Sequence, residues 1–127
     1  MSILLTGSSG EIGKILLQYI ISKKIKCYAN SRKINLQNSL NNKYLTYYKK
    51  NIDDDFYIPK DVEIICHLAA MLPKKNNKDM YDYNVDMNKN LIKKIKESNS
   101  LKKLIFFSTA RVYNNSNKGK INERNFL

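Results

Sequence analysis

Short apolar runs alternate along the chain with longer segments in which apolar residues recur at helical spacing. The apolar runs are typical of buried strands and lie at residues 2–6, 26–31, 44–48, 62–68 and 104–107. The two helical segments lie at residues 11–23 and 79–98. Because strands that alternate with helices form βαβ units, the pattern predicts an α/β fold with a doubly wound parallel sheet. We expect the strand order 3-2-1-4-5 within one domain, residues 1–127.

Each predicted helix carries a stripe of residues that we expect to face the sheet. The stripe of the first helix consists of Ile12, Ile15, Leu16, Tyr19 and Ile20. The stripe of the second helix consists of Met80, Asn84, Met87, Leu91 and Ile95. Asn84 is the polar exception, and a buried amide without partners costs about 1–3 kcal/mol. We therefore expect Asn84 to form hydrogen bonds, either within a functional site or simply from helix to loop.

A glycine-rich turn follows the first predicted strand and opens the first predicted helix. Its sequence, TGSSGEIG, contains Gly7, Gly10 and Gly13. In such a turn the first glycine permits a sharp bend, the second lets a pyrophosphate approach the backbone, and the third lets the helix pack closely. The N–H groups at the helix N-terminus then attract phosphate. The predicted dinucleotide-binding residues here are Gly7, Ser9, Gly10, Glu11, Ile12 and Gly13, and an ordinary glycine-rich turn is the structural alternative.

Four motifs together resemble the extended short-chain dehydrogenase/reductase family of NAD(P)-dependent nucleotide-sugar epimerases and dehydratases. The turn is similar to the family's TGxxGxxG, and residues 67–70, HLAA, are similar to its HxAA segment. Asn84-Val85 matches its NV pair, and residues 108–113, STARVY, resemble its S(S/T)xxVY. The order and spacing hold across essentially all 127 residues. The resemblance implies a Rossmann-like fold and the cofactor-binding part of an oxidoreductase that acts on a nucleotide sugar.

The end of the second strand bears on the choice of cofactor. In this type of fold a carboxylate at that position binds the ribose 2′-hydroxyl of NAD, and an arginine accommodates the 2′-phosphate of NADP. This chain has Ser31 and Arg32 and no acidic residue there. We therefore expect NADP(H) to be preferred, with NAD as the alternative. By resemblance, further cofactor-binding residues are Asn51, Ile52, Leu68, Ala69, Ala70 and Asn84, whereas His67 is expected to be a packed residue at the end of a strand.

The resemblance implies one catalytic residue within the chain, Thr109, which would bind the reacting hydroxyl. The family's catalytic tyrosine and its lysine partner, spaced Tyr-xxx-Lys, are expected beyond Tyr113, and the 127 residues do not contain such a pair there. Tyr19 and Lys23 have that spacing, but we expect Tyr19 to face the core. We expect the chain alone to be inactive, as part of a longer enzyme. The alternative is a non-catalytic dinucleotide-binding module, either a decayed paralogue or a redox-sensing regulator.

Composition and charge narrow the range of partners. The net charge is +12 and 23 residues are basic, but 20 of these are scattered lysines without interleaved aromatic residues. We therefore expect a solvated basic surface and no nucleic-acid partner. We also expect no membrane partner, no metal site and a cytoplasmic location, with the first strand starting almost at Met1. The two cysteines, Cys27 and Cys66, lie in apolar runs and are expected to be reduced core residues.

The resemblance also carries an expectation about stability. In the family a helix after the fifth strand covers one face of the sheet, and we expect the chain to end before it. Apolar surface of the fourth and fifth strands would then be exposed. We therefore expect the isolated chain to be marginally stable or to associate, for example as a homodimer.

Overall fold

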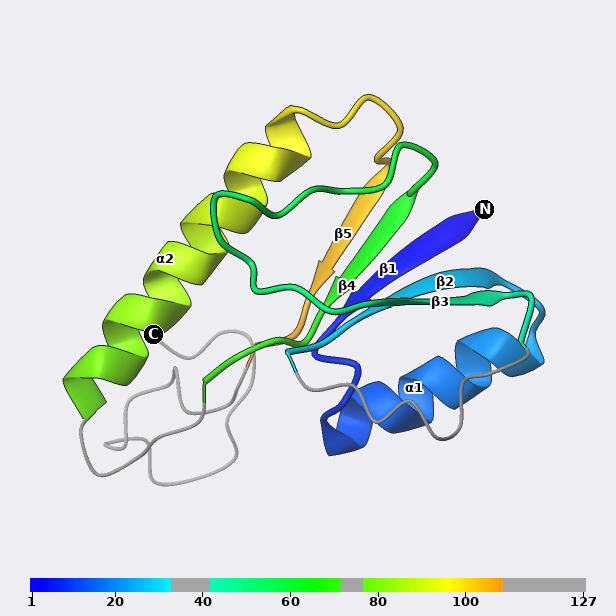
Figure 1. Ribbon diagram of the computed structural model, residues 1–127, viewed down its shortest axis with the longest axis horizontal. Coiled ribbons are helices and arrows are strands. Elements are labelled where there is room, and N and C mark those ends of the chain that lie inside the picture. Colours follow the sequence, from blue (N-terminus) through cyan, green and yellow to red (C-terminus); the bar gives the residue numbers. More distant parts are fainter. Residues whose placement is uncertain (33–41, 72–76, 109–127) are drawn as a thin grey trace, which may run out of the picture.

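A computed structural model describes residues 1–32, 42–71 and 77–108, which form a parallel sheet with one helix on each face (Figure 1). The elements in chain order are β1 (Ser2–Thr6), α1 (Glu11–Ser22), β2 (Lys26–Asn30), β3 (Leu45–Tyr48), β4 (Ile64–His67), α2 (Asn77–Lys96) and β5 (Lys103–Phe106). The strand order is β3-β2-β1-β4-β5, and every pairing is parallel. The predicted fold and strand order are confirmed. Thr109 and the rest of residues 109–127 lie outside the described residues.

The core on one face of the sheet lies under α2. Leu4 of β1 and Ile65 of β4 point to this face and pack against Met87 and Leu91 of the helix. The segment that follows β3 adds Phe56, which is fully buried. Because the helical residues Met87 and Leu91 are buried and Ile95 is partly buried, the predicted stripe of this helix is confirmed.

The predicted stripe of α1 is correct for Ile20 and wrong for most of its other positions. The residues of this helix that are buried against the sheet are Gly13, Leu17 and Ile20. A Cβ on Gly13 would lie 2.2 Å from the Gly7 carbonyl oxygen, so position 13 must face the turn, and positions 17 and 20 follow on the same side. Of the five residues of the predicted stripe, Ile20 is buried and Leu16 is partly buried, as expected. The other three, Ile12, Ile15 and Tyr19, are instead 62%, 70% and 60% exposed. Cys27 and Cys66, both free, are buried in the core between α1 and the sheet, as predicted.

β5 forms an edge of the sheet with exposed apolar side chains. Leu104, Ile105 and Phe106 are all exposed. The expectation that apolar surface of the fourth and fifth strands is exposed is therefore correct for β5. It is wrong for most of β4, where Ile65 and His67 are buried because α2 covers one face of the sheet. In the part of the chain that the structure describes, neither helix is long and apolar enough to span a membrane.

Candidate functional site

The glycine-rich turn lies against the end of β4. Gly7 has a φ of +70°, a left-handed conformation that favours glycine. A Cβ at this position would lie 2.8 Å from the backbone nitrogen of Ala69. The N–H of Gly10 donates to the Gly7 carbonyl at 3.0 Å and closes the turn. The first glycine therefore permits both the bend and the close approach of the 68–70 segment.

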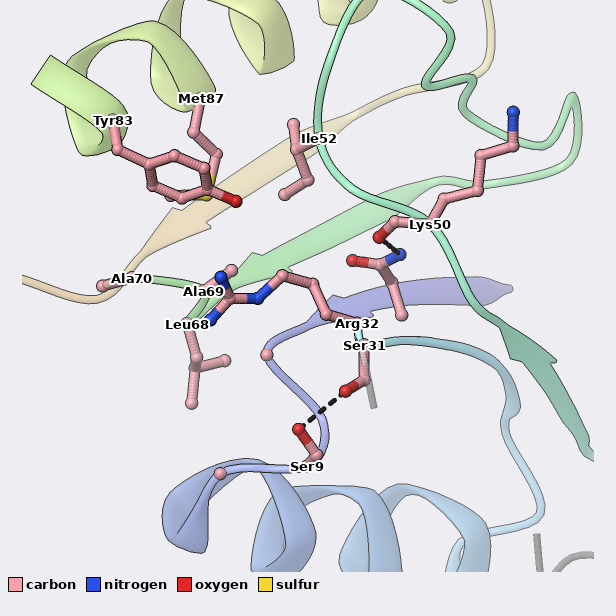
Figure 2. A pocket seen from close by; sticks show the side chains of 13 residues that line it. Ser9, Ser31, Arg32, Lys50, Ile52, Leu68, Ala69, Ala70, Tyr83 and Met87 are labelled. Atoms are coloured by element: carbon pink, nitrogen blue, oxygen red, sulfur yellow. Dashed lines mark hydrogen bonds between the residues drawn. The ribbon is translucent and has the colours of Figure 1, made fainter. Parts of the chain in front are cut away.

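Serine and asparagine side chains tie the turn to the neighbouring strands. The Ser8 hydroxyl donates to the Asn30 carbonyl at 2.9 Å, and the Ser31 hydroxyl donates to the Ser9 hydroxyl oxygen at 2.6 Å (Figure 2). The Asn30 amide in turn donates to the carbonyls of Tyr48 at 3.0 Å and of Lys50 at 2.9 Å. These bonds fix the turn and the carboxyl ends of β2 and β3 relative to one another.

These strand ends surround a cavity of about 300 Å³ (Figure 2). It lies beside β1, where the strand order reverses, and ligands of doubly wound sheets bind in that place. Its thirteen lining residues include the cations Arg32 and Lys50 and no carboxylate. They are Gly7, Ser9, Gly10, Asn30, Ser31, Arg32, Lys50, Ile52, Leu68, Ala69, Ala70, Tyr83 and Met87.

The two cations are placed differently. Arg32 extends across the cavity, and its guanidinium lies 5.7 Å from the centre of the Tyr83 ring (Figure 2). The ammonium of Lys50 points away from the cavity and donates to the Asp55 carbonyl at 3.2 Å. Arg32 is therefore the cation that faces the cavity at the end of β2.

Asn84 holds the loop that follows β4. Its amide forms two hydrogen bonds with the Met71 backbone, accepting from the N–H at 2.7 Å and donating to the carbonyl at 3.0 Å. The hydrogen bonds expected of Asn84 are therefore present, and they run from the helix to this loop. Asn84 does not line the cavity, and it fixes the chain next to the lining residue Ala70.

His67 is packed at the end of β4, as predicted, and is only 1% exposed. Its Nδ1 lies 2.7 Å from the Thr6 hydroxyl, and its Nε2 lies 3.0 Å from the Asn88 amide oxygen. Burial lowers the pKa of the imidazole, which outweighs the opposite effect of the bond to Asn88. The side chain is therefore neutral near pH 7.

The structure brings together most of the residues that the sequence indicated. Nine of the predicted cofactor-binding residues line the cavity: Gly7, Ser9, Gly10, Ser31, Arg32, Ile52, Leu68, Ala69 and Ala70. Five do not, and they are Glu11, Ile12, Gly13, Asn51 and Asn84. Gly13 is buried against the turn, whereas Asn51 is exposed between the lining residues Lys50 and Ile52. Within the described ranges, no cluster of three or more His, Cys, Asp or Glu side chains exists that could bind a metal.

Sequence reasoning missed four lining residues, Asn30, Lys50, Tyr83 and Met87. Asn30 carried a usable signal, since a polar residue at the end of a buried strand faces the edge where ligands bind. Tyr83 and Met87 are four residues apart, the spacing that places two side chains on one helix face. Met87 was assigned to the core, where it also packs.

The site fits the diphosphate of a dinucleotide. A Cβ at Gly10 would lie 3.3 Å from the Gly7 oxygen and would occupy space beside the turn. As the N-cap of α1, Gly10 provides no side-chain hydrogen bond, so the N–H groups of the first helical turn have no capping side chain. An anion at this position would meet those N–H groups and the positive end of the helix dipole.

Comparison with known proteins identifies the family of the chain. A family model described as the NAD dependent epimerase/dehydratase family matches residues 3–126. No match was found among curated protein sequences.

Three solved structures show the same fold. UDP-glucuronic acid 4-epimerase from Bacillus cereus, in complex with NAD, is 24% identical with a TM-score of 0.83, over 99% of this chain and 45% of that one. dTDP-glucose 4,6-dehydratase from Bacillus anthracis, also in complex with NAD, is 24% identical with a TM-score of 0.75. The match covers 100% of this chain and 43% of that one. Yeast methylglyoxal/isovaleraldehyde reductase, in complex with NADPH, is 17% identical with a TM-score of 0.72. The match covers 86% of this chain and 37% of that one. The chain thus spans less than half the length of these proteins.

Proposed function

The chain belongs to the NAD dependent epimerase/dehydratase family, and we propose that it is the NADP(H)-binding part of an enzyme that acts on a nucleotide sugar. The observation that carries the cofactor preference is the end of β2, where Ser31 and Arg32 line the cavity without a carboxylate. The family model and the shared fold support the binding of a dinucleotide, and Arg32 supports the binding of the 2′-phosphate that distinguishes NADP(H) from NAD(H).

The diphosphate would be held by backbone groups of the turn. The N–H groups of the first turn of α1 would bind its oxygens, and Gly10 leaves the space for it. Ser9 and Ser31, already joined by a hydrogen bond, would lie beside the adenosine ribose. Ile52 and Met87 provide apolar surface for the adenine ring on the same side of the cavity (Figure 2).

Arg32 would select the phosphorylated form of the cofactor. A guanidinium forms two parallel hydrogen bonds with a phosphate, and such charge-assisted pairs are stronger than neutral ones. A carboxylate at the same position would repel the 2′-phosphate. NAD lacks that phosphate and would lose this pair, so we propose a preference for NADP(H) over NAD(H).

The substrate class follows from the relatives. Two of the similar structures are, by their names, a UDP-sugar epimerase and a dTDP-sugar dehydratase, and the third is a reductase that carries NADPH. When bound, the nicotinamide supplies the hydride chemistry that such a reaction needs at a sugar carbon. Thr109, by resemblance, would hydrogen-bond the reacting hydroxyl. We propose that catalysis belongs to the full-length protein and that residues 1–127 alone are inactive.

The experiment that tests this proposal is a titration of the purified chain with NADPH and NADH, followed by nucleotide fluorescence. We expect NADPH to bind more tightly and the Arg32→Asp variant to lose that preference. Lys50→Asp is the matched control, because Lys50 also lines the cavity but its ammonium points away from it. The proposal fails if neither nucleotide binds, or if the two substitutions reduce the preference equally.

A further inference from the structure

A chain of three hydrogen bonds joins β1, β4 and α2 behind the glycine-rich turn. The N–H of Ala69 donates to the Thr6 hydroxyl oxygen at 3.3 Å. The same hydroxyl lies 2.7 Å from Nδ1 of His67, whose Nε2 lies 3.0 Å from the side-chain oxygen of Asn88. Thr6 is fully buried and His67 is 1% exposed, so solvent does not compete for these bonds.

The positions of the protons follow from the donors and acceptors. The Asn88 side-chain oxygen only accepts, so the bond to it requires a proton on Nε2 of His67. A neutral imidazole carries one ring proton, so its Nδ1 is then an acceptor, and the Thr6 hydroxyl donates to it. The Thr6 oxygen remains free to accept from Ala69. In this arrangement every proton of the chain of bonds has an acceptor.

We propose that neutral His67, acting through Thr6, is a positioning residue for the dinucleotide site. This inference rests on the proposed function, because it assigns a role to the cavity as a nucleotide site. By accepting the hydroxyl proton of Thr6, His67 turns the oxygen of that hydroxyl toward the N–H of Ala69. The bond holds the Ala69 backbone against Gly7, at the place where the first glycine of the turn leaves room for it.

The position of Ala69 matters because both it and Gly7 line the cavity. The backbone nitrogen of Ala69 lies 2.8 Å from the point that a Cβ on Gly7 would occupy, so the two segments are in close contact. A shift of the 68–70 segment would therefore change the shape of the cavity where the turn meets it. His67 itself does not line the cavity and would act only through this contact.

Protonation of His67 would remove the acceptor. With both ring nitrogens protonated, Nδ1 would donate to Thr6, and the Thr6 hydroxyl proton would lose the acceptor that it has in the neutral state. Among the described side chains, the hydrogen-bond partners of the ring are Thr6 from β1 and Asn88 from α2, and its aromatic neighbour is Phe106 from β5, whose ring centre lies 5.3 Å away. None of these is ionisable, and the causes of the lowered pKa of His67 include no charged group.

Two substitutions separate this role from simple packing. In His67→Asn, the side-chain oxygen replaces Nδ1 and still accepts from Thr6, but the contact with Asn88 is lost. In His67→Gln, the longer side chain reaches toward Asn88, but no acceptor remains at the position of Nδ1. Packing alone would favour glutamine, because it fills more of the volume of the imidazole. The positioning role predicts the opposite order for nucleotide affinity.

The test is calorimetric titration of wild type, H67N and H67Q with NADP⁺ between pH 5.5 and pH 8. At pH 8 we expect H67Q to bind about tenfold more weakly than H67N, the effect of leaving one buried hydroxyl without an acceptor. As the pH falls below 6.5 toward the lowered pKa of His67, we expect wild type to lose affinity relative to H67N. Comparing the proteins at the same pH cancels the titration of the 2′-phosphate itself. Equal or tighter binding by H67Q would overturn the inference.

A second measurement does not depend on the nucleotide. His67 is the only histidine in the sequence, so a ¹⁵N-labelled chain gives one pair of imidazole nitrogen signals. At pH 7.5 we expect the signals of a neutral ring with the proton on Nε2, and a proton on Nδ1 would contradict the proposed arrangement. If wild type does not bind NADP⁺ at pH 8, the proposed function fails together with the role of His67. If it binds and H67Q equals H67N, only the inference fails.

Discussion

The guanidinium of Arg32, at the end of β2, lies 5.7 Å from the centre of the Tyr83 ring, on α2. The pair spans the cavity and connects elements that are 51 residues apart in sequence, a contact that neither motif nor periodicity indicates (Figure 2). A cation above an aromatic ring is held in place at a gain of about 0.5–1 kcal/mol at exposed sites. Tyr83 therefore keeps Arg32 extended across the cavity.

Replacing Tyr83 by leucine should weaken NADPH binding about two- to fivefold, the effect of losing one exposed cation–π contact. Tyr83→Phe keeps an aromatic ring and should bind NADPH like the wild type. Fluorescence titration measures both. Tyr81→Leu is the control on the same helix, since Tyr81 is 67% exposed and does not line the cavity. Equal effects at positions 81 and 83 would contradict a role for the ring of Tyr83.

Patterns that are local in sequence predicted much of this site. The GxxGxxG turn, the end of β2 and the segment after β4 each lie at the carboxyl end of a strand, and the parallel sheet brings those ends together. Tyr83 was missed because it lies on α2, more than a dozen residues after β4. Whether a helix residue reaches the cavity depends on how the helix is rotated and placed over the sheet, which spacing alone does not determine.

The helix α1 shows how a single contact can override apolar periodicity. Two faces of its sequence are apolar enough to be buried, and the predicted one included Ile15 and Tyr19. The structure buries the face with Gly13 and Leu17, because Gly13 packs against the backbone of the turn, where a Cβ would not fit. The contact is tertiary and involves a residue without a side chain, so a count of apolar positions gives it no weight.

Alanine substitutions on the two faces of α1 test this assignment. Leu17 is 8% exposed, so Leu17→Ala should lower the free energy of unfolding by about 2–5 kcal/mol. Ile15 is 70% exposed, and Ile15→Ala should change it by less than about 0.5 kcal/mol. Urea unfolding followed by circular dichroism measures both variants. If Ile15→Ala loses more free energy of unfolding than Leu17→Ala, the face predicted from the sequence is the buried one.

Alanine at two glycines of the turn should have unequal effects. A Cβ on Gly13 would lie 2.2 Å from the Gly7 oxygen and 2.9 Å from the Ser8 Cα, both backbone atoms that cannot move without shifting the turn. Gly13→Ala should therefore destabilise the fold by about 1–3 kcal/mol or more, as overpacking does. In Gly10→Ala the same contact would be 3.3 Å, and the loss should be smaller. The midpoints of urea unfolding compare the two variants. An equal loss of stability would show that the backbone of the turn can shift to accommodate a Cβ at position 13.

The two cysteines should be unreactive in the folded chain. Burial raises the pKa of the Cys27 thiol to about 12 and also raises that of Cys66. Because the thiolate is the nucleophile, a disulfide reagent at pH 8 should label both slowly in buffer and rapidly in urea. Absorbance of the released thiolate follows the reaction. Fast labelling of one cysteine without urea would show that its strand opens locally.

Stability should fall in two separate pH ranges, because two kinds of group titrate. The pKa of His67 is lowered in the folded chain, so below about pH 6.5 the unfolded chain binds the proton more readily. The contribution of His67 is therefore complete above that pH and is lost as the pH falls toward its folded value. The carboxyl groups of Asp61 and Glu63 have lowered pKa values because Tyr28 and Lys102 hydrogen-bond them. Their contribution is lost only at more acidic pH, below the ordinary values of 3.8 and 4.5.

Urea unfolding at pH 7.5 and pH 5.5 isolates the first range. For one proton the free energy of unfolding falls by at most about 1.4 kcal/mol per pH unit. His67→Asn removes the only histidine, so the variant should lose less stability than the wild type between these two pH values, although it is less stable at both. The comparison depends on the difference between two pH values, so the packing lost in the variant cancels. An equal loss in wild type and variant would mean that His67 titrates alike in the folded and unfolded chains, contrary to its burial between β1, β5 and α2.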